Sequence, residues 1–455
     1  MATTAAPEAC AELVVRARAA QEQWARRGHA DRAAVLREAV RVVRRHADAI
    51  ADAIVAETGK PRTEAIANEL YAACDRARWL ARNAPRVLAD ERVPLSQLHL
   101  KTKRAWVVYE PLGVVRVISP WNLPFAIPFG IVAAAVAAGN GVVLKPSEHT
   151  PAVAEWIPRV LAEAGAPAGL VQVAPSEREA GEALVAEPGI AKLFFTGSVA
   201  VGRTVAAAAG ARGCPVVLEL GGHDPLVVFA DADVERALDG ALFASFLNAG
   251  QACVSAERIY VERPLHEEFR TRLAERARAL ELGPLVLEGR VAPAEVVEGP
   301  LPDEEIFGPR VAVEPFDGED DAVRRANDSS FGLAASVWSR DVAKAQRVAR
   351  RIDAGMVWVN DFGYSFAAGQ APWGGVKASG FGRTGGRHGL YECVNVKYVD
   401  ADRGRVRPGW WFPYDERTER ALRNALDVLY GEGVERWRAA WRYRGDLRQL
   451  ARRSR

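Results

Sequence analysis

The chain has few cysteines, little net charge and no long apolar run. Its five cysteines, at positions 10, 74, 214, 253 and 393, are odd in number and widely separated. This spacing argues against a disulfide framework and against paired metal ligands. We therefore expect reduced thiols, a cytoplasmic protein and no metal site.

The charge balance argues against a nucleic-acid-binding protein, and the apolar runs argue against a membrane-spanning one. A net charge of +2 over 455 residues makes nucleic acid an unexpected partner. The longest apolar run, residues 127–138, is too short to cross a bilayer, so no transmembrane segment is expected. The N-terminus lacks the basic and apolar regions of a secretory signal.

What is present is an α/β pattern on a chain long enough for two domains. From Val114 onward, short apolar runs alternate with helical ones, which predicts a parallel, doubly wound sheet. The expected strands are 114–118, 142–145, 170–173, 192–195 and 215–219, and the expected helices are 125–138, 151–164, 179–186 and 199–209. The pair Asn140-Gly141 leaves a hairpin open as the alternative at that point.

A second alternation begins at Pro225. Its expected strands are 226–229, 257–261, 311–316, 334–337 and 356–359, with helices at 234–247, 265–279, 320–326 and 341–351. The two halves meet close to Glu219. Because ligand sites in such folds favour domain junctions and the carboxyl ends of strands, we expect the site there.

Cys253 and Glu219 are candidates for catalysis. Cys253 ends the run Gly250-Gln-Ala-Cys253, and Glu219 begins Glu219-Leu-Gly-Gly222. A thiol nucleophile and a carboxylate suggest covalent catalysis followed by activation of a water. The alternative is plain packing, because a lone cysteine is usually a small buried hydrophobe.

Two further segments are candidates for a dinucleotide site. Thr196-Gly-Ser198, with Gly202, follows an apolar run and opens an Ala-rich helix, an order that suits a pyrophosphate. Lys145-Pro-Ser-Glu148 supplies a cation for phosphate or ribose and an acceptor for ribose hydroxyls. The alternatives are ordinary helix capping and a solvated ion pair.

Taken together, the motifs resemble the aldehyde dehydrogenase superfamily in order and spacing, from about Trp24 to Tyr398. They are Ser119-Pro-Trp-Asn122, Lys145–Glu148, Thr196–Ser198, Glu219–Gly222, Gly250–Cys253, Glu305-Ile-Phe-Gly-Pro309 and Gly374–Arg383. The resemblance implies a Rossmann-type cofactor domain, an α/β catalytic domain and small oligomerisation strands. It also implies oxidation of an aldehyde to a carboxylic acid.

The resemblance also implies roles for individual residues. Cys253 is the expected nucleophile and Glu219 the base that hydrolyses the thioester. Asn122, with the Cys253 backbone N–H, is expected to hold the oxyanion. The cofactor is expected to be NAD, with NADP as the alternative, and its contacts are Ser119, Trp121, Lys145, Glu148, Gly197, Ser198, Gly202, Leu220, Glu305 and Phe307.

Domain boundaries follow from the same resemblance. Residues 1–97 and 112–220 are expected to form the cofactor domain and 221–390 the catalytic domain. Residues 98–111 and 391–401 are the expected oligomerisation strands of a homodimer or homotetramer. Residues 402–455 are an extension with amphipathic helices at 416–429 and 434–443, which either dock onto the protein or lie on an anionic membrane surface.

The aldehyde is expected to be hydrophobic. By position, the tunnel of the family is lined here by Leu123, Ala126, Ile127, Gly130, Leu247, Ala252 and Trp373, with no arginine or lysine among them. Such a lining suits aliphatic or aromatic aldehydes.

The chain also departs from the family pattern. Cys253 and Glu305 are only 52 positions apart, about half the usual spacing of the family. We therefore expect a helix and strands to be missing, and Glu305 to be the site residue that this loss would displace from the cofactor. Pro175-Ser-Glu-Arg-Glu179 replaces a glycine turn, and His223 replaces a common lysine and receives no role. An inactive scaffold and a CoA-acylating enzyme are the rival functions. An intact Glu219 argues against the second, which needs no hydrolytic base.

Overall fold

The computed structural model describes residues 5–97, 100, 102–402 and 411–453. The chain divides into two compact units. Unit 1 comprises Met1–Ala89 and Tyr109–Asn395, and unit 2 comprises Asp90–Val108 and Val396–Arg455. Both predicted sheets and every predicted site residue belong to unit 1.

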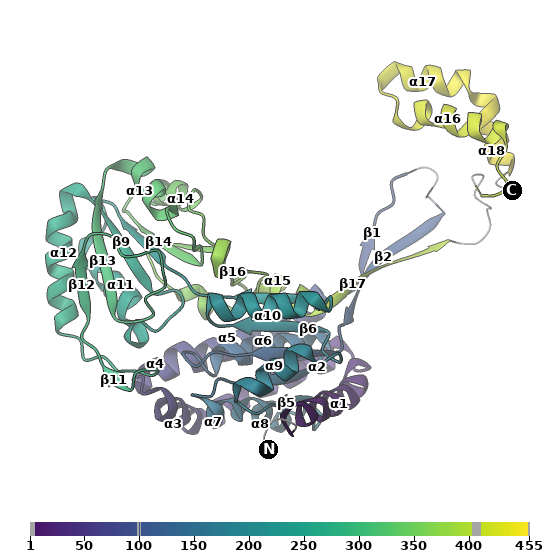
Figure 1. The fold of residues 1–455 in the computed structure, drawn as a ribbon. Helices are drawn as coiled ribbons and strands as arrows, with labels where there is room; N and C mark the ends of the chain where they lie inside the picture. Colours follow the sequence, from purple (N-terminus) through teal and green to yellow (C-terminus); the bar gives the residue numbers. More distant parts are fainter. Residues whose placement is uncertain (1–4, 98–99, 101, 403–410, 454–455) are drawn as a thin grey trace. The chain divides into compact units, whose positions relative to one another are not determined.

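The first sheet of unit 1 has six strands in the order β16-β7-β6-β3-β4-β5 (Figure 1). Five are the predicted parallel strands, and β16 pairs antiparallel with β7. Because β4 has parallel neighbours on both sides, the hairpin alternative at Asn140-Gly141 is wrong. The strands are β3 (Val114–Ile118), β4 (Gly141–Lys145), β5 (Val171–Val173), β6 (Lys192–Thr196), β7 (Val216–Glu219) and β16 (Gly380–Phe381).

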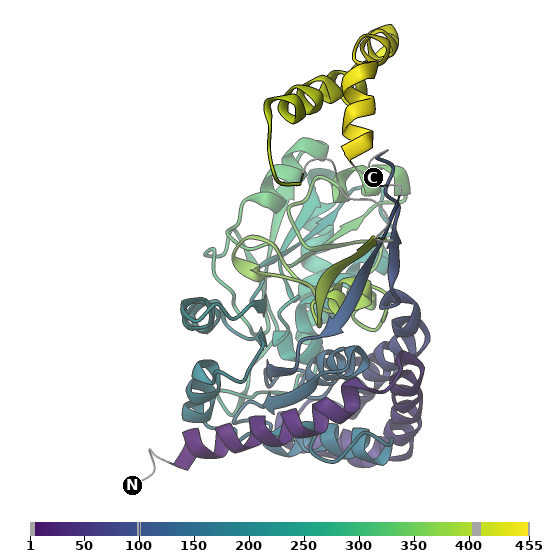
Figure 2. The ribbon, with the colours of Figure 1, turned by 90° about the vertical axis from the view of Figure 1, so that its right-hand side faces the viewer.

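Helices cover both faces of this sheet because successive apolar side chains point to opposite faces. Val115 and Phe194 pack under α2 (His29–Arg45), α5 (Ala72–Val87), α6 (Ala126–Ala138) and α8 (Trp156–Glu163). Val114 and Leu193 pack under α1 (Ala5–Ala25), α9 (Arg178–Ala186) and α10 (Val199–Ala211). Figure 2 shows α1 in purple.

Helix α6 explains the long apolar run, because every one of its residues is buried. The helix predicted over 151–164 is interrupted at Glu155 and becomes α7 (Pro151–Ala154) and α8. The remaining N-terminal helices are α3 (Ala47–Thr58), α4 (Arg62–Glu64) and the π-helical turn η1 (Ala65–Tyr71).

The second sheet of unit 1 is wholly parallel, in the order β12-β13-β9-β8-β14-β15. It contains β8 (Asp224–Val228), β9 (Ala256–Glu262), β12 (Glu295–Glu298), β13 (Arg310–Phe316), β14 (Ala334–Trp338) and β15 (Met356–Val359). The edge strand β12 and the small hairpin of β10 (Pro284–Leu285) and β11 (Arg290–Val291) were not predicted. All three occupy the shortened segment between Cys253 and Glu305.

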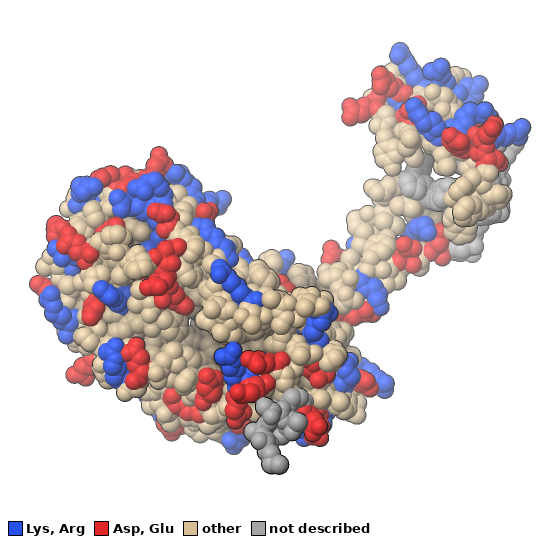
Figure 3. Space-filling model, in the orientation of Figure 1, with Lys and Arg blue, Asp and Glu red and all other residues tan. Residues whose placement is uncertain are grey.

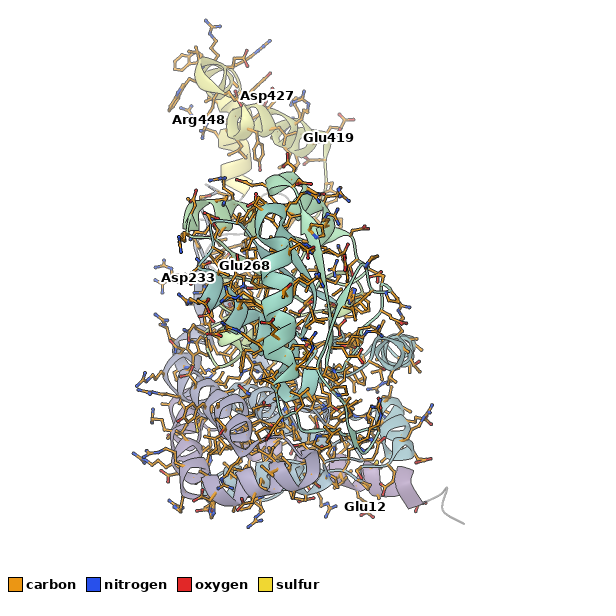
Figure 4. All side chains as sticks on the ribbon, turned by 90° about the vertical axis from the view of Figure 1, so that its left-hand side faces the viewer. Glu12, Asp233, Glu268, Glu419, Asp427 and Arg448 are labelled. Carbon is orange, nitrogen blue, oxygen red and sulfur yellow. The ribbon has the colours of Figure 1, made fainter. Side chains whose placement is uncertain are left out.

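Two helices pack on each face of this sheet. One face is covered by α11 (Val234–Phe246) and α12 (Arg263–Arg278), the other by α13 (Gly318–Asn327) and α14 (Val342–Ala349). Asp233, labelled in Figure 4 with Glu268 of α12, caps α11 by accepting from the Arg236 N–H at 3.3 Å. The short helix α15 (Gly386–Tyr391) returns to the first layer, where Leu390 joins the core.

Unit 2 contains a three-stranded sheet and a helical extension. The sheet order is β1 (Glu91–Val93), β2 (Lys103–Pro111) and β17 (Val394–Asp402). Both segments predicted to contain oligomerisation strands, 98–111 and 391–401, contain a strand, but β2 begins only at Lys103 and β17 at Val394. Residues 98, 99 and 101 lie outside the described residues. The extension contains the two predicted helices, α16 (Glu416–Tyr430) and α17 (Gly433–Arg442), and a third, α18 (Arg444–Arg453).

The extension leaves large apolar side chains exposed. Helix α16 buries Ala421 and Ala425, whereas Trp437 and Trp441 of α17 are about three-quarters exposed. Both docking and membrane contact therefore stay predictions. No helix in the described part of the chain is long and apolar enough to cross a membrane.

On the face of unit 1 shown in Figure 3, acidic and basic side chains are interspersed. No large patch of one sign is seen on that face. This distribution agrees with the small net charge of the sequence.

Candidate active site

A cavity of about 960 Å³ lies at the carboxyl ends of β3, β4, β6 and β7. Twelve of the thirteen predicted site residues line it: Ser119, Trp121, Asn122, Lys145, Glu148, Gly197, Ser198, Glu219, Leu220, Cys253, Glu305 and Phe307. Gly202 is beneath the wall, where an added Cβ would meet Leu220 Cδ2 at 2.4 Å. The structure therefore gathers residues that span almost two hundred positions of the chain.

The topology explains this gathering. Parallel strands end at the same edge of a sheet, so the segments that follow β3, β4, β6 and β7 meet there. Cys253 precedes β9, and Glu305 precedes β13, which is the neighbour of β9. The second sheet thus contributes the beginnings of two adjacent strands to a cavity made by the ends of the first.

The loop before Cys253 has an unusual backbone. Asn248, Ala249 and Gly250 of the turn η3 (Leu247–Gly250) all have left-handed φ angles, of 54°, 57° and 75°. Gly250 also approaches Gly308 so closely that a Cβ would lie 2.2 Å from the Gly308 carbonyl oxygen. Such strain persists only where surrounding contacts enforce it, and it marks functional loops. Here the close approach of Gly250 to Gly308 joins the cysteine loop to the Glu305-Ile-Phe-Gly segment.

Asn122 is buried and held by the same loop. Its Nδ2 donates to the Gln251 carbonyl at 3.1 Å, and its Oδ1 accepts from the Leu123 N–H at 3.0 Å. An amide nitrogen has two hydrogens. The second hydrogen of Asn122 is therefore available to a ligand beside Cys253.

A buried ion pair that the sequence did not reveal supports Asn122. Lys60 Nζ donates to Glu69 Oε1 at 2.8 Å and to the Asn122 carbonyl at 2.6 Å. Glu69 Oε2 accepts from the N–H groups of Phe125 and Ala126 at the start of α6. In the sequence, Lys60 is only part of a helix break, because its partners are brought to it by tertiary packing.

We expect Lys60→Met to lower the free energy of unfolding by about 3–5 kcal/mol, since it leaves the buried Glu69 carboxylate without its cation. Urea denaturation measures this loss. Arg62→Met is the matched control, because Arg62 pairs with Asp48 and Asp52 at the surface and should cost far less. Equal losses in the two variants would contradict the assignment.

Glu219 is buried at the end of β7 and has an unusual pKa. Burial raises the pKa of its carboxyl to about 7, while the hydrogen bond from Thr384 and the charges of Arg76 and Arg383 lower it. Thr384 Oγ1 donates to Glu219 Oε1 at 2.5 Å. Pairing of Gly380 with Glu219 brings this distant segment to the site. A carboxyl that titrates near neutrality suits proton transfer.

Cys253 and Glu305 lie in the same low-dielectric environment. Burial, together with the Glu305, Glu219 and Asp224 carboxylates, raises the pKa of the Cys253 thiol well above its usual range. Burial and Glu257 raise the pKa of Glu305 to about 8. The thiol is therefore protonated in the free protein and must lose this proton when it reacts.

The shortened segment keeps Glu305 in the cavity, where its Oε1 accepts from the Gly222 N–H at 3.3 Å. The segment itself is tied to the cysteine loop, because Gln251 donates to the Pro284 carbonyl at 3.1 Å and accepts from the Val286 N–H at 2.9 Å. The displacement considered from the sequence does not occur in this structure.

His223, which received no role in the sequence analysis, holds the Glu305 segment through Glu257. His223 Nδ1 lies 2.6 Å from Glu257 Oε2, and both side chains are 2% exposed. Glu257 Oε1 accepts from the N–H groups of Ile306 and Phe307 at 2.9 and 3.1 Å. The Phe307 ring then lies edge-on to Trp121, with centroids 5.5 Å apart.

The other end of the cavity fits a dinucleotide. Ser198 caps α10 by accepting from the Val201 N–H at 3.4 Å, so a helix N-terminus faces the space. Lys145 Nζ lies 3.9 Å from Glu148, and within the described residues the buried Thr196 hydroxyl has no hydrogen-bond partner. Donors for phosphate and an acceptor for ribose hydroxyls are therefore present together.

One correction concerns the expected tunnel. The sequence indicated no arginine or lysine in it, but the structure places Arg76 of α5 directly against Gly130. The guanidinium carbon also lies 4.7 Å from the centre of the Phe366 ring. Arg76 was missed because its helix lies far from the tunnel residues in sequence.

Comparison with known proteins gives one family. The profile of the aldehyde dehydrogenase family matches residues 2–293 and 295–399. The chain is 36% identical to the 4,4'-diapolycopene aldehyde oxidase of Methylomonas sp, over 85% of this chain and 80% of that protein. It is 37% identical to a betaine aldehyde dehydrogenase of Cereibacter sphaeroides, over 89% and 91% respectively.

Solved structures agree with the sequence relatives. The NAD+ complex of an aldehyde dehydrogenase from Bacillus cereus superposes with a TM-score of 0.83 at 31% identity, covering 87% of this chain and 89% of that one. Betaine aldehyde dehydrogenase from Staphylococcus aureus, also with NAD+, gives a TM-score of 0.82 at 29% identity, covering 89% of each chain.

Proposed function

Since this chain belongs to the aldehyde dehydrogenase family, we propose that it oxidises an aldehyde to a carboxylic acid with NAD+ through a covalent intermediate on Cys253. The family and the α/β fold that the sequence predicts are confirmed by the comparisons. The observation that carries the mechanism is the single cavity lined by Cys253, Glu219 and Asn122 at one end and by Lys145, Glu148 and the start of α10 at the other.

In the first step, Cys253 Sγ bonds to the aldehyde carbon. As the C–S bond forms, the thiol loses its proton to solvent water, so that Glu219 stays free to act as base in the hydrolysis step. The negative charge that develops on the aldehyde oxygen is stabilised by Asn122 Nδ2 and the Cys253 backbone N–H. Asn122 is preorganised for this by its bond to the Gln251 carbonyl.

The cofactor end binds NAD+, which accepts a hydride when bound. Lys145 and Glu148 are assigned to the ribose, the α10 N-terminus with Gly197 and Ser198 to the pyrophosphate, and Glu305 and Phe307 to the nicotinamide side. Ser119, Trp121 and Leu220 form the walls between these parts, and Gly202 lets α10 approach Leu220.

In the second half, Glu219 acts as base for hydrolysis of the Cys253 thioester. Thr384 holds Oε1, so Oε2 is the atom that removes a proton from the attacking water. The C–S bond then breaks, the carboxylic acid leaves and Cys253 regains its proton. A CoA-acylating enzyme needs no such base, so an intact Glu219 favours hydrolysis.

NADH formation on adding a panel of aldehydes tests this function. We propose hydrophobic aldehydes as the best class, because Leu123, Ala126, Ile127, Ala252 and Trp373 are apolar. Absence of NADH with every aldehyde would favour the alternative, a catalytically impaired scaffold. Thioester formation with coenzyme A in place of free acid would favour the acylating enzyme.

We expect a preference for NAD+ over NADP+, because the Glu148 carboxylate at the ribose end would repel a 2′-phosphate. Glu148→Gln should narrow the NAD+/NADP+ ratio of kcat/KM on the order of tenfold. Glu179→Gln is the control, because it removes the same charge from an exposed residue of α9 that does not line the cavity. A clear NADP+ preference of the unchanged protein would contradict the assignment.

We further propose a homodimer or homotetramer in the cytoplasm, with residues 1–97 and 112–220 as the cofactor domain and 221–390 as the catalytic domain. Strand β17 at the edge of its sheet exposes Val396 and Tyr398, as a strand that pairs with another subunit would. All five cysteines are free thiols, which supports a reducing compartment.

A further inference from the structure

Arg76 is a buried cation without a salt-bridge partner among the described residues. It is 5% exposed, and no described residue forms a salt bridge with it. Its Nε donates to the Phe366 carbonyl at 3.3 Å, which is the only hydrogen bond of this guanidinium within the described part of the chain. An arginine has five donors. Most of the hydrogen-bonding capacity of Arg76 is therefore unused by the protein.

The guanidinium lies against residues of the expected aldehyde tunnel. An added Cβ on Gly130 would lie 2.8 Å from both Arg76 Cδ and Nη1, so the arginine fills the space that the glycine leaves. The guanidinium also covers the ring of Phe366, whose centroid is 5.0 Å from that of Trp373. Gly130 and Trp373 are both expected tunnel residues.

The charge of Arg76 also reaches the reaction centre. Its positive charge lowers the pKa of Glu219, which opposes the effect of burial on that carboxyl. Asp75, the residue before Arg76 on α5, accepts from the Gly369 N–H through its Oδ2 at 2.9 Å. A cationic group bound in the expected tunnel against the guanidinium would therefore face a positive charge that no salt bridge neutralises, at low dielectric.

We propose that Arg76 is a specificity-determining residue that excludes aldehydes carrying a positive charge. The inference rests on the proposed aldehyde oxidation. Two effects act together: charge repulsion, and occupation of the Phe366 face, which would otherwise bind a quaternary ammonium group. This chain therefore differs from the relatives whose names include betaine aldehyde, and it accepts uncharged aldehydes instead.

A pair of isosteric aldehydes isolates the charge. Betaine aldehyde and tert-butylacetaldehyde have the same shape, with a quaternary nitrogen in the first and a carbon in the second. The unchanged protein should oxidise tert-butylacetaldehyde with a kcat/KM at least about tenfold higher. Because both substrates use the same Cys253 and Glu219, any effect of Arg76 on those groups cancels in the ratio.

Substitutions of Arg76 then test whether this residue causes the difference in kcat/KM between the two aldehydes. Arg76→Met, which keeps the length of the side chain without its charge, should reduce the preference by at least about tenfold. Arg76→Gln serves if the Met variant does not fold, and Arg76→Lys should retain the preference. Arg78→Met is the control, because it removes the same net charge from an exposed arginine two residues later on α5, whereas Arg76 is buried.

Two results would overturn the assignment of the preference to Arg76. One is an unchanged ratio in both uncharged Arg76 variants, and the other is an equal fall in Arg78→Met, which would indicate only the net charge of the protein. If the unchanged protein oxidises neither isostere nor any other aldehyde, the proposed function fails and this inference fails with it. Turnover of both isosteres at equal rates would refute the selectivity alone.

Discussion

Cys253→Ala should abolish NADH formation with every aldehyde, a loss on the order of 10⁴-fold or more, because no other described cysteine lines the cavity to carry the thioester. NADH absorbance with the best aldehyde of the panel measures it. Even a single turnover should be absent, since the Cys253 adduct precedes hydride loss. The protein should still fold, because the thiol makes no side-chain hydrogen bond to another described residue.

Cys74→Ala is the matched control for Cys253. Cys74 is partly buried on α5, and burial raises its pKa to about 11, so it is an unreactive thiol outside the cavity. Its variant should keep full activity. Residual activity of Cys253→Ala above a hundredth of normal, or an equal loss in Cys74→Ala, would remove Cys253 from the role of nucleophile.

Glu219→Gln should give a burst of NADH close to one equivalent per site, followed by turnover that is about 10²–10⁴-fold slower. The glutamine keeps the shape and the bond with Thr384 but cannot take a proton from water. Stopped-flow absorbance resolves the burst from the steady state. Loss of the burst together with turnover would assign Glu219 to the first step instead.

The pH profile tests the same residue. Because the pKa of Glu219 is about 7 and only its carboxylate is a base, turnover of the unchanged protein should rise with pH through about 7. Below that pH the carboxyl is protonated and hydrolysis slows. In Glu219→Gln this limb should vanish, and Glu182→Gln, an exposed acid at the cofactor end, should leave it in place. An unchanged limb in Glu219→Gln would refute the assignment.

Much of the fold could be predicted because its strands are short, apolar and buried on both sides. All ten strands predicted in the two α/β halves are present, each within two residues of the expected ends. The exceptions have a physical reason. Strand β12 has partly exposed valines between exposed glutamates, and β16 has two residues, one of them glycine. Neither has the apolar run that marks a buried strand.

The site residues that could be predicted are those in short motifs whose position along a strand or helix sets their chemistry. Gly197, Ser198 and Lys145 stand at strand ends, and their chemistry depends on that position alone. Lys60, Thr384 and His223 carry no such mark. Each acts through a partner far away in sequence: Glu69 and Asn122 for Lys60, Glu219 for Thr384, and Glu257 for His223. Only the packing of separate elements brings these pairs together.

The sequence by itself determined the α/β class, the succession of strands and helices along the chain and the residues proposed to carry the reaction. These follow from apolar periodicity and from short motifs in which neighbours in sequence are neighbours in space. The tertiary structure alone decided that the shortened segment still brings Glu305 to Gly222, and that Arg76 lies against Gly130. Both depend on how helices and loops from different parts of the chain pack. The spacing of residues along the sequence does not determine this packing.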